Sequence, residues 1–367
     1  MTVFQKSIIV LITLSLAALI IPSCSDGTVV YSELDYYREG QLKNTFRNEI
    51  APLHALFAGE CAKLSNVSIT FTNQLNEENL IKLRKQWLET ILVWKRCELY
   101  NQGPVEQSFI HNSIDKWPVN ATTIETAING EDIIDKSYIA SRGSNAKGLA
   151  AIEYLIFNQE KNTSEVLNDF SNSRRLDYLS SLSENLVEVS ESTNSMWTGY
   201  QNEFETQAGG GLEGGQNKLI NNLINLLEEI VQTKVGKVLG NSNGGTPMPS
   251  LAEGYNSAAS LQMIKANLKT IERCYTGEFS QAPFRVGFDE FLIQSESIAL
   301  NERILNQIQS CYESIDKIQN ELGSAVISEN QQVVALYDTF GELLILLKVD
   351  LANVLGSTIT FTDNDGD

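Results

Sequence analysis

The chain has 367 residues, with 46 acidic and 27 basic side chains and a formal net charge of −19 at pH 7. A surface of this sign repels nucleic acid and anionic lipid, which excludes a nucleic-acid-binding function. It favours cations or cationic partners, although acidic surfaces are more often simply solubilising. The length is sufficient for two domains of ordinary size.

The first residues have the composition of a secretory signal. Lys6 supplies a positive charge, residues 8–21 form an apolar run, and Pro22-Ser23-Cys24 follows. The run is too short to span a membrane comfortably, and it ends in small residues before a cysteine. We therefore predict a lipoprotein signal peptide over residues 1–23 and a lipid on Cys24 that anchors the protein in the bacterial cell envelope. The polar residue after Cys24 favours an outer-membrane location. The alternative to a lipoprotein signal is an ordinary signal peptide followed by an incidental cysteine.

Four cysteines follow Cys24 in the chain: Cys61, Cys97, Cys274 and Cys311. An even number of cysteines in an exported protein favours disulfides. The spacing within the first pair nearly equals the spacing within the second. We therefore predict the disulfides Cys61–Cys97 and Cys274–Cys311, with the two other pairings and free buried thiols as alternatives.

Apolar side chains recur every three or four residues over most of the chain. The clearest runs are Leu80–Trp94, Leu179–Val189, Ile304–Leu322 and Leu336–Val354. Each run places an apolar stripe on one face of a helix, and such a stripe needs partner helices to cover it. Alternation long enough for a sheet is absent, and only the short connectors Ser68–Thr72 and Thr358–Thr362 are expected to be extended.

Glycine and proline mark the breaks between these helices. They fall at Gly103-Pro104, at Trp117-Pro118, at 209–215, at 240–249 and around Pro283. The glycine cluster at 209–215 divides the chain into comparable halves, each with enough long helices for a four-helix-type bundle. We therefore predict an all-α fold of two packed helical-bundle domains, residues 24–208 and residues 209–367.

Glu153 lies within the apolar stretch Lys147–Phe157, which has the pattern of a helix. A carboxylate among apolar side chains is costly to bury unless another group pairs with it. Ala150, one turn earlier on the same face, has no atom that can bind a metal or a proton. For a structural role, we expect Glu153 to pair with an arginine such as Arg96 or Arg142, or to cap a neighbouring segment.

Several segments, in this order and at this spacing, resemble the imelysin-like proteins of bacterial envelopes, also known as the M75 peptidase family. These segments are Trp94–Glu98 leading to Tyr100–Val105, Ile114–Val119, Lys147–Phe157, Lys234–Gly240 and Phe361–Asp367. The resemblance implies an all-helical fold with two bundle-like domains and a site near their junction. It also implies a link to the acquisition of iron or other metals, and some members of the family have been described as peptidases.

The resemblance also assigns a site. Gly148 and Glu153 match the family signature Gly-x-His-x-x-Glu, but Ala150 occupies the histidine position. A histidine and a glutamate three residues apart share one helix face, where they can bind one metal or act as an acid/base pair. Alanine can do neither. The predicted junction site consists of Gly148, Ala150, Glu153, Asp115, Trp117 and Arg96, and no catalytic residue is assigned.

The hypothesis that follows is a lipid-anchored, non-catalytic envelope protein. It would bind a small ligand at the junction and act in iron, metal or nutrient uptake with a transport partner. No cofactor is assigned, and iron or another divalent metal on Glu153 is the candidate. One alternative is a metallopeptidase that uses Glu153 with Asp115, His111 or other carboxylates, and another is a helical interaction protein with a vestigial site. Zinc is not indicated, because Cys-x-x-Cys is absent and the only histidines, His54 and His111, are expected on the surface or in loops.

Overall fold

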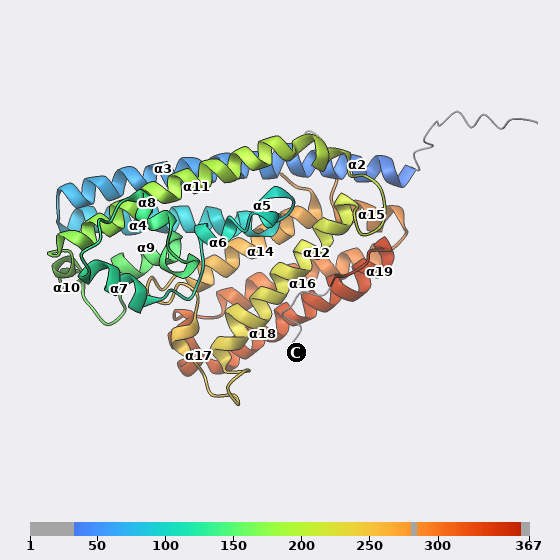
Figure 1. Cartoon of the computed structure of the whole chain (residues 1–367). Coiled ribbons are helices and arrows are strands. Elements are labelled where there is room, and N and C mark those ends of the chain that lie inside the picture. The colour runs from blue at the N-terminus through green and yellow to red at the C-terminus, as the bar shows by residue number, and fades with distance from the viewer. Residues whose placement is uncertain (1–32, 280–284, 361–367) are drawn as a thin grey trace, which may run out of the picture. The chain divides into compact units, whose positions relative to one another are not determined.

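The computed structural model describes residues 33–279 and 285–360. The predicted signal peptide, Cys24, Pro283 and the tail 361–367 lie outside the described residues. Within the described residues the chain forms helices and no strands, which confirms the all-α prediction (Figure 1). None of the described helices combines the length and the apolar character needed to cross a bilayer.

The helices before the glycine-rich segment include two long ones, α3 and α11. The elements in chain order are α2 (Glu33–Thr45), η1 (Phe46–Ile50), α3 (Ala51–Asn73), α4 (Glu77–Cys97), η2 (Glu98–Tyr100), α5 (Pro104–Gln107), α6 (His111–Ile114), α7 (Ala121–Asn129), α8 (Lys136–Ala140), η3 (Ser144–Ala146), α9 (Gly148–Ile156), α10 (Thr163–Asp169) and α11 (Ser173–Thr206).

The helices after the glycine-rich segment are of more even length. They are α12 (Gly215–Glu228), η4 (Glu229–Gly236), α13 (Lys237–Leu239), η5 (Pro249–Leu251), α14 (Ser260–Thr276), α15 (Phe288–Gln294), α16 (Ile298–Asp316), α17 (Leu322–Ser328), α18 (Asn330–Ile345), η6 (Leu346–Leu351) and α19 (Ala352–Leu355). The segments η1, η4 and η6 are π-helical and continue the neighbouring α-helices without a break.

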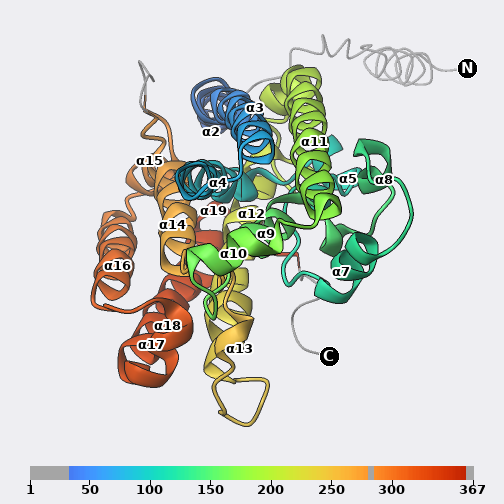
Figure 2. The ribbon, with the colours of Figure 1, turned by 90° about the vertical axis from the view of Figure 1, so that its left-hand side faces the viewer.

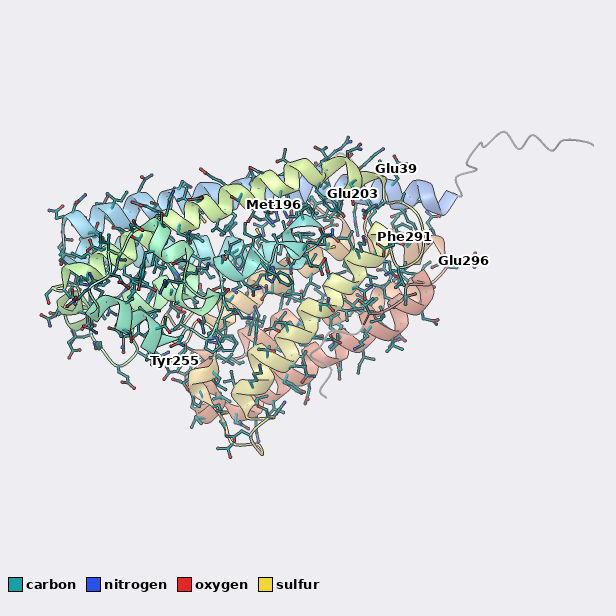
Figure 3. All side chains as sticks on the ribbon, in the orientation of Figure 1. Glu39, Met196, Glu203, Tyr255, Phe291 and Glu296 are labelled. Atoms are coloured by element: carbon teal, nitrogen blue, oxygen red, sulfur yellow. The ribbon has the colours of Figure 1, made fainter. Side chains whose placement is uncertain are left out.

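The helices pack in two groups that share one core. In the first group, α3 lies along both α11 and α4, and α9 contacts α4 and α11 (Figure 1). In the second, α14 contacts α16, and α18 contacts both α16 and α12 (Figure 2). Helix α14 also packs on α4, and α12 packs on η2, so the two groups meet directly. Side chains fill the space between the helices (Figure 3).

The break at 209–215 is present, but it does not separate two bodies. Helix α11 ends at Thr206 and α12 begins at Gly215. The described residues from Asp35 onward form one compact unit, and one apolar core runs from Leu42 to Leu351. The predicted division into residues 24–208 and 209–367 therefore corresponds to a change of helix group within a continuous core.

The apolar stripes are buried as predicted, with two differences. On α4, the stripe from Leu80 to Trp94 is almost fully buried. The run Ile304–Leu322, however, covers two helices, because α16 ends at Asp316 and the Glu321 side chain accepts hydrogen bonds from the first backbone N–H groups of α17. Ser68–Thr72 belongs to α3 and is not extended, since its β-branched residues continue an established helix.

The two predicted disulfides are absent from the structure. Cys61, Cys97, Cys274 and Cys311 are buried free thiols. Cys311 Sγ donates to the carbonyl of Thr339 at 3.6 Å on α18, and Cys274 lies beside the Tyr100 side chain. Cys61 lies close enough to Cys97 to contribute to the shift of its pKa. Burial raises the pKa of each thiol. The near-equal spacings reflect regular core positions on helices, where cysteine acts as a small apolar residue.

The burial of these thiols predicts that they are unreactive in the folded protein. A thiol reagent should leave all four unmodified under native conditions and should modify all four in denaturant without any reductant. Mass spectrometry of the non-reduced digest measures both states. A Cys61–Cys97 or Cys274–Cys311 cross-linked peptide would restore the disulfide prediction.

Candidate functional site

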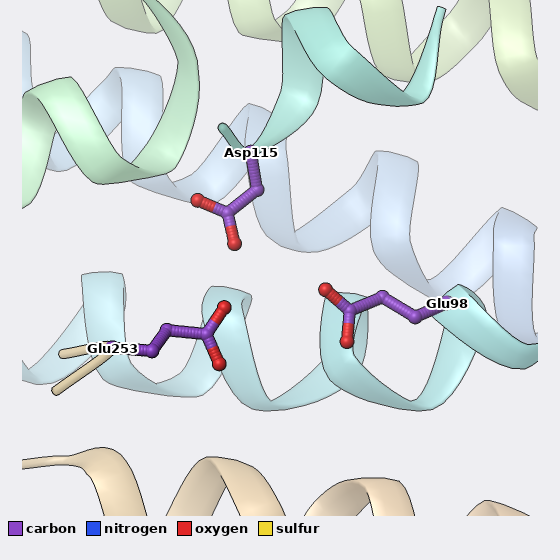
Figure 4. A group of neighbouring side chains, drawn as sticks. All are labelled: Glu98, Asp115 and Glu253. Atoms are coloured by element: carbon purple, nitrogen blue, oxygen red, sulfur yellow. The ribbon is translucent and has the colours of Figure 1, made fainter. Parts of the chain in front are cut away.

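A buried lysine holds three carboxylates at the place where the two helix groups meet. Lys95 Nζ lies 2.6 Å from Glu98 Oε1, 2.7 Å from Asp115 Oδ2 and 2.7 Å from Glu253 Oε1. An ammonium has three donors, and each is used on a different carboxylate. The Lys95 side chain is 0% exposed. Figure 4 shows that the three carboxyl groups face a common centre.

A second lysine supports the same carboxylates from the other helix group. Lys234 Nζ, from η4, lies 3.1 Å from Glu98 Oε2, 2.9 Å from Glu253 Oε2 and 2.9 Å from Asn267 Oδ1. The Asn267 amide donates to Glu98 Oε2 at 2.9 Å and to the Lys95 carbonyl at 2.6 Å. With three carboxylates and two ammonium groups, the cluster has one negative charge in excess.

The charges in the cluster depend on one another. Burial alone would lower the pKa of Lys95, but Asp115, Glu253 and Glu98 outweigh burial and hold its pKa well above the ordinary value. Burial would raise the pKa of Glu253, yet Lys234 and Lys95 bring it down to about 2. The pKa of Asp115 is raised by burial, and the neighbouring Glu253 and Glu98 add to this shift against the pull of Lys95.

The three carboxylates have the geometry of a cation site. One oxygen from each of Glu98, Asp115 and Glu253 lies within 4.8 Å of the others, an arrangement that could hold a metal ion. The Lys95 ammonium already occupies the position of that ion. The residues therefore do not fit a metal at this point unless the Lys95 side chain leaves it.

A cavity of about 420 Å³ lies beside the cluster. Residues of both helix groups line it. From the first group come Trp94, His111, Asp115 and Trp117, and from the second come Asn222, Asn225, Glu229, Lys234 and Glu253. A cavity of this size that contains a few polar groups is typical of a small-molecule site.

Asp115 is positioned by a close approach between α6 and α9. Gly148 begins α9 with φ +73°, and a Cβ atom there would lie 2.2 Å from the carbonyl oxygen of Ile114. Only glycine allows both this backbone conformation and this contact. Because Asp115 directly follows Ile114, Gly148 fixes the place at which the Asp115 carboxylate enters the cluster.

Glu153 lies near the cluster but is not part of it. Its Oε1 accepts the backbone N–H of Ser257 at 2.8 Å. Burial raises the pKa of Glu153 to about 7, the hydrogen bonds from Ser257 oppose this shift, and Asp115 and Glu253 add to it. Ala150 is buried on the same helix, α9. Of the two structural roles expected for Glu153, the capping of a neighbouring segment is the one observed, at Ser257. Neither Arg96 nor Arg142 pairs with Glu153 within the described residues.

The structure brings some predicted site residues to the cavity and leaves others away from it. Asp115 and Trp117 line the cavity. Arg96 pairs with Glu49 of η1 at 3.2 Å, and Arg273 binds the same carboxylate. The prediction that Arg96 belongs to the junction site is therefore not supported by any contact with the cluster, because its guanidinium is committed to Glu49.

Both histidines line the cavity. His54 is buried within α3, so the expected surface or loop position is wrong for this residue, whereas His111 is half-buried at the start of α6. His54 is 2% exposed, and its Nδ1 donates to the carbonyl of Ile50 at 2.9 Å. Burial lowers the pKa of His54 to about 4 despite this hydrogen bond, so the ring is neutral at pH 7. In this tautomer Nε2 is an acceptor, and it makes no hydrogen bond within the described residues.

The site predicted from the sequence did not include Lys95, Lys234, Glu253 or Asn267. Lys95 directly follows the last apolar residue of the α4 stripe, and Glu98 lies three residues later on the same face, so a local ion pair could have been found. Lys234 lies in one of the family-like segments. Glu253 has no local signal, because it joins the cluster from a loop 158 positions after Lys95.

We predict that Gly148→Ala destabilises the protein by at least about 2 kcal/mol, because alanine is strained at φ +73° and its methyl group meets Ile114. Gly199→Ala is the matched control: Gly199 lies within α11, where an added Cβ atom would have no other heavy atom within 4 Å, and alanine there should stabilise the helix by about 0.5–1 kcal/mol. Urea denaturation measures both. Equal changes in the free energy of unfolding for the two variants would contradict the close approach between Gly148 and the Ile114 carbonyl.

We predict a pH-dependent effect of Glu153→Gln. The carboxyl of Glu153 has a pKa of about 7 in the folded protein, above its unfolded value, so its contribution to stability is full below about pH 4 and is lost as the pH rises through about 7. Glutamine keeps the acceptor for Ser257 and cannot ionise. The variant should match the wild type near pH 4 and exceed its stability by up to about 3 kcal/mol near pH 8.

Denaturant titrations across this pH range provide the measurement. Glu131→Gln, at an exposed position, serves as the control and should follow the wild type at every pH. Parallel stability curves for the wild type and Glu153→Gln would show that Glu153 ionises normally.

Comparison with known proteins agrees with this fold. The family model described as Imelysin (Peptidase_M75) matches residues 50–347. The crystal structure of an imelysin-like protein from Psychrobacter arcticum 273-4 aligns with a TM-score of 0.75 and 17% identity, covering 89% of this chain and 98% of that chain. The "putative iron-regulated protein A precursor" of Parabacteroides distasonis ATCC 8503 aligns with a TM-score of 0.72 and 15% identity, covering 89% and 97%.

At these identities the two solved structures establish a common fold. No curated protein matches the chain. The family model, in contrast, covers most of the sequence, from the end of η1 to the start of η6. The protein therefore belongs to the imelysin family.

Proposed function

We propose that this imelysin-family protein is a non-catalytic binding protein of the bacterial cell envelope, which takes up a small ligand in the cavity beside Lys95. The observation that carries the proposal is the position of the Lys95 ammonium, 2.6–2.7 Å from three carboxylates. A metal at this point would need these three carboxylates as its ligands. In this structure the Lys95 ammonium is hydrogen-bonded to all three of them instead.

The α9 helix supports the same proposal. On the family resemblance, Ala150 replaces the signature histidine, and a metal or proton site on α9 would rest on Glu153 alone. Glu153 Oε1 is engaged by the Ser257 N–H at 2.8 Å. A buried carboxylate that is already hydrogen-bonded and has no imidazole neighbour is poorly suited to activate a water molecule.

The cavity supports the ligand-binding part of the proposal. It lies at the meeting of the two helix groups and holds about 420 Å³. Trp94 and Asn222 line it, and the Trp94 indole N–H and the Asn222 amide nitrogen are buried without a hydrogen-bond partner. Buried donors without partners are unfavourable, and a bound ligand with acceptor atoms would satisfy them.

The envelope location remains part of the proposal and rests on the sequence. Lys6, the apolar run and Cys24 have the order of a lipoprotein signal, and a lipid on Cys24 would hold the protein at a bilayer. A tethered binding protein suits nutrient uptake together with a transport partner. The iron-regulated description applies to the Parabacteroides protein, and in this chain an iron role would require the Lys95 side chain to leave the carboxylates.

We predict that Lys95→Met destabilises the protein by about 3–5 kcal/mol, because three buried carboxylates lose their shared cation. The same variant should gain affinity for Ca²⁺, Zn²⁺ or Fe³⁺ by at least about tenfold over the wild type, since the vacated position offers three oxygen ligands. Isothermal titration calorimetry of the mature protein measures the affinity. Lys82→Met removes an exposed ion pair with Glu78 and should change neither quantity appreciably.

Tight metal binding by the wild-type protein that is lost in Asp115→Asn or Glu153→Gln would contradict the proposed function. If Lys95→Met is too unstable to titrate, these two single variants of the wild-type protein carry the test by themselves. Circular dichroism establishes that each variant is folded before it is titrated.

A further inference from the structure

The walls of the cavity select against anions. Six carboxylates line it, namely Glu98, Glu106, Asp115, Glu228, Glu229 and Glu253. The lysines on the wall are Lys116, which is exposed, and Lys234, whose ammonium is committed to Glu98, Glu253 and Asn267. An anionic ligand would meet repulsion from more carboxylates than the one uncommitted lysine, Lys116, could offset, whereas a cation would be attracted.

Glu229 is the wall carboxylate best placed to receive a ligand cation. It is half-buried at the start of η4, and it forms no ion pair or hydrogen bond within the described residues. A half-buried carboxylate without a partner is unfavourable. By contrast, Glu98 and Glu253 each pair with both Lys95 and Lys234. A positive group of a ligand would therefore be attracted more strongly by Glu229.

The aromatic side chains of the cavity favour an organic cation over a metal ion. Trp94 and Trp117 line the same cavity as Glu229. Indole rings attract ammonium groups through their π-faces, and this attraction strengthens where water is excluded. Trp94 is 4% exposed, so a cation in contact with its ring would be largely desolvated.

The polar atoms without partners indicate that the ligand also has neutral hydrogen-bonding groups. Trp94 Nε1 and Asn222 Nδ2 are donors that lack an acceptor. Asn101 Oδ1 is a buried acceptor that lacks a donor, and Asn101 lines the cavity as Trp94 and Asn222 do. His54 also lines the cavity, and its Nε2 is an acceptor, because its Nδ1 carries the proton. A hydroxyl group can both donate and accept a hydrogen bond, so a ligand with several hydroxyl groups would satisfy these donors and acceptors.

We propose that the cavity binds a small hydroxylated organic cation of the amino-sugar class, an inference that rests on the binding function proposed above. The ammonium group pairs with Glu229 and contacts an indole ring. The hydroxyl groups accept from Trp94 and Asn222 and donate to Asn101 and His54. The carboxylate cluster around Lys95 forms the rigid, negatively charged side of the cavity.

The test uses four ligands with one carbon frame and different charges: D-glucosamine, N-acetyl-D-glucosamine, D-glucose and D-glucuronate. Calorimetric titration of the mature wild-type protein at about pH 6, where the sugar amine is protonated, should give an affinity for glucosamine at least about tenfold above that for glucose or N-acetylglucosamine. Glucuronate should not bind.

Three variants assign the contacts. Glu229→Gln should weaken glucosamine binding by at least about fivefold and leave glucose binding unchanged, because only the charged contact is lost. Trp94→Phe keeps a ring but removes the indole N–H, so it should weaken glucosamine and glucose alike. Glu131→Gln, at an exposed position outside the cavity, should bind as the wild type does.

The outcomes separate this inference from the proposed function. Binding of glucose or glucuronate as tightly as glucosamine, with loss in Trp94→Phe, would overturn the amino-sugar class and leave a ligand-binding cavity. Absence of glucosamine binding would also overturn the class. The proposed function itself fails only in the metal titration, if the wild-type protein binds a metal through Asp115 or Glu153.

Discussion

The contact between one ammonium and three carboxylates is the interaction on which the centre of this protein depends. Lys95 comes from α4, and its partners come from η2, from the end of α6 and from the loop before α14. Without the lysine, three acidic groups would be buried together, and their repulsion would drive these elements apart. With it, the elements meet at fixed positions and form one side of the cavity. A buried ion pair adds little to stability by itself, but here it specifies which segments meet.

Local features of the sequence were sufficient for the helices. The stripe from Leu80 to Trp94 has helical periodicity, and Asn76 caps α4 by accepting the N–H of Asn79. Asp115 and Trp117 were identified from the family-like segment, and both line the cavity. The cluster could not be predicted in the same way, because Lys95 and Glu253 are 158 residues apart and their contact depends on how α4 and α14 pack. Periodicity identifies the buried face of a helix but does not identify the helix that covers it.

Helix α9 has a different role from the one its signature residues suggested. Gly148 lets the start of the helix touch Ile114, and Glu153 accepts a hydrogen bond from the backbone at Ser257. Through these contacts α9 supports both Asp115 and the loop that contains Glu253, and it leaves the cavity wall to other residues. The free thiols also differ from expectation: cysteines at regular helix positions are core residues, and spacing alone cannot distinguish them from bonded pairs.

Two of the interior charges lie in π-helical segments, Glu49 in η1 and Lys234 in η4. A π-turn accommodates more residues than an α-turn, and such segments are often found at functional sites. Deleting one residue between Glu229 and Gly236 would return the chain to α-helical winding, because a π-turn takes up an additional residue. Family members that differ in length by a single residue here would therefore keep the same side chains facing the interior beyond the segment, and only the side chains of the π-turn itself would change position.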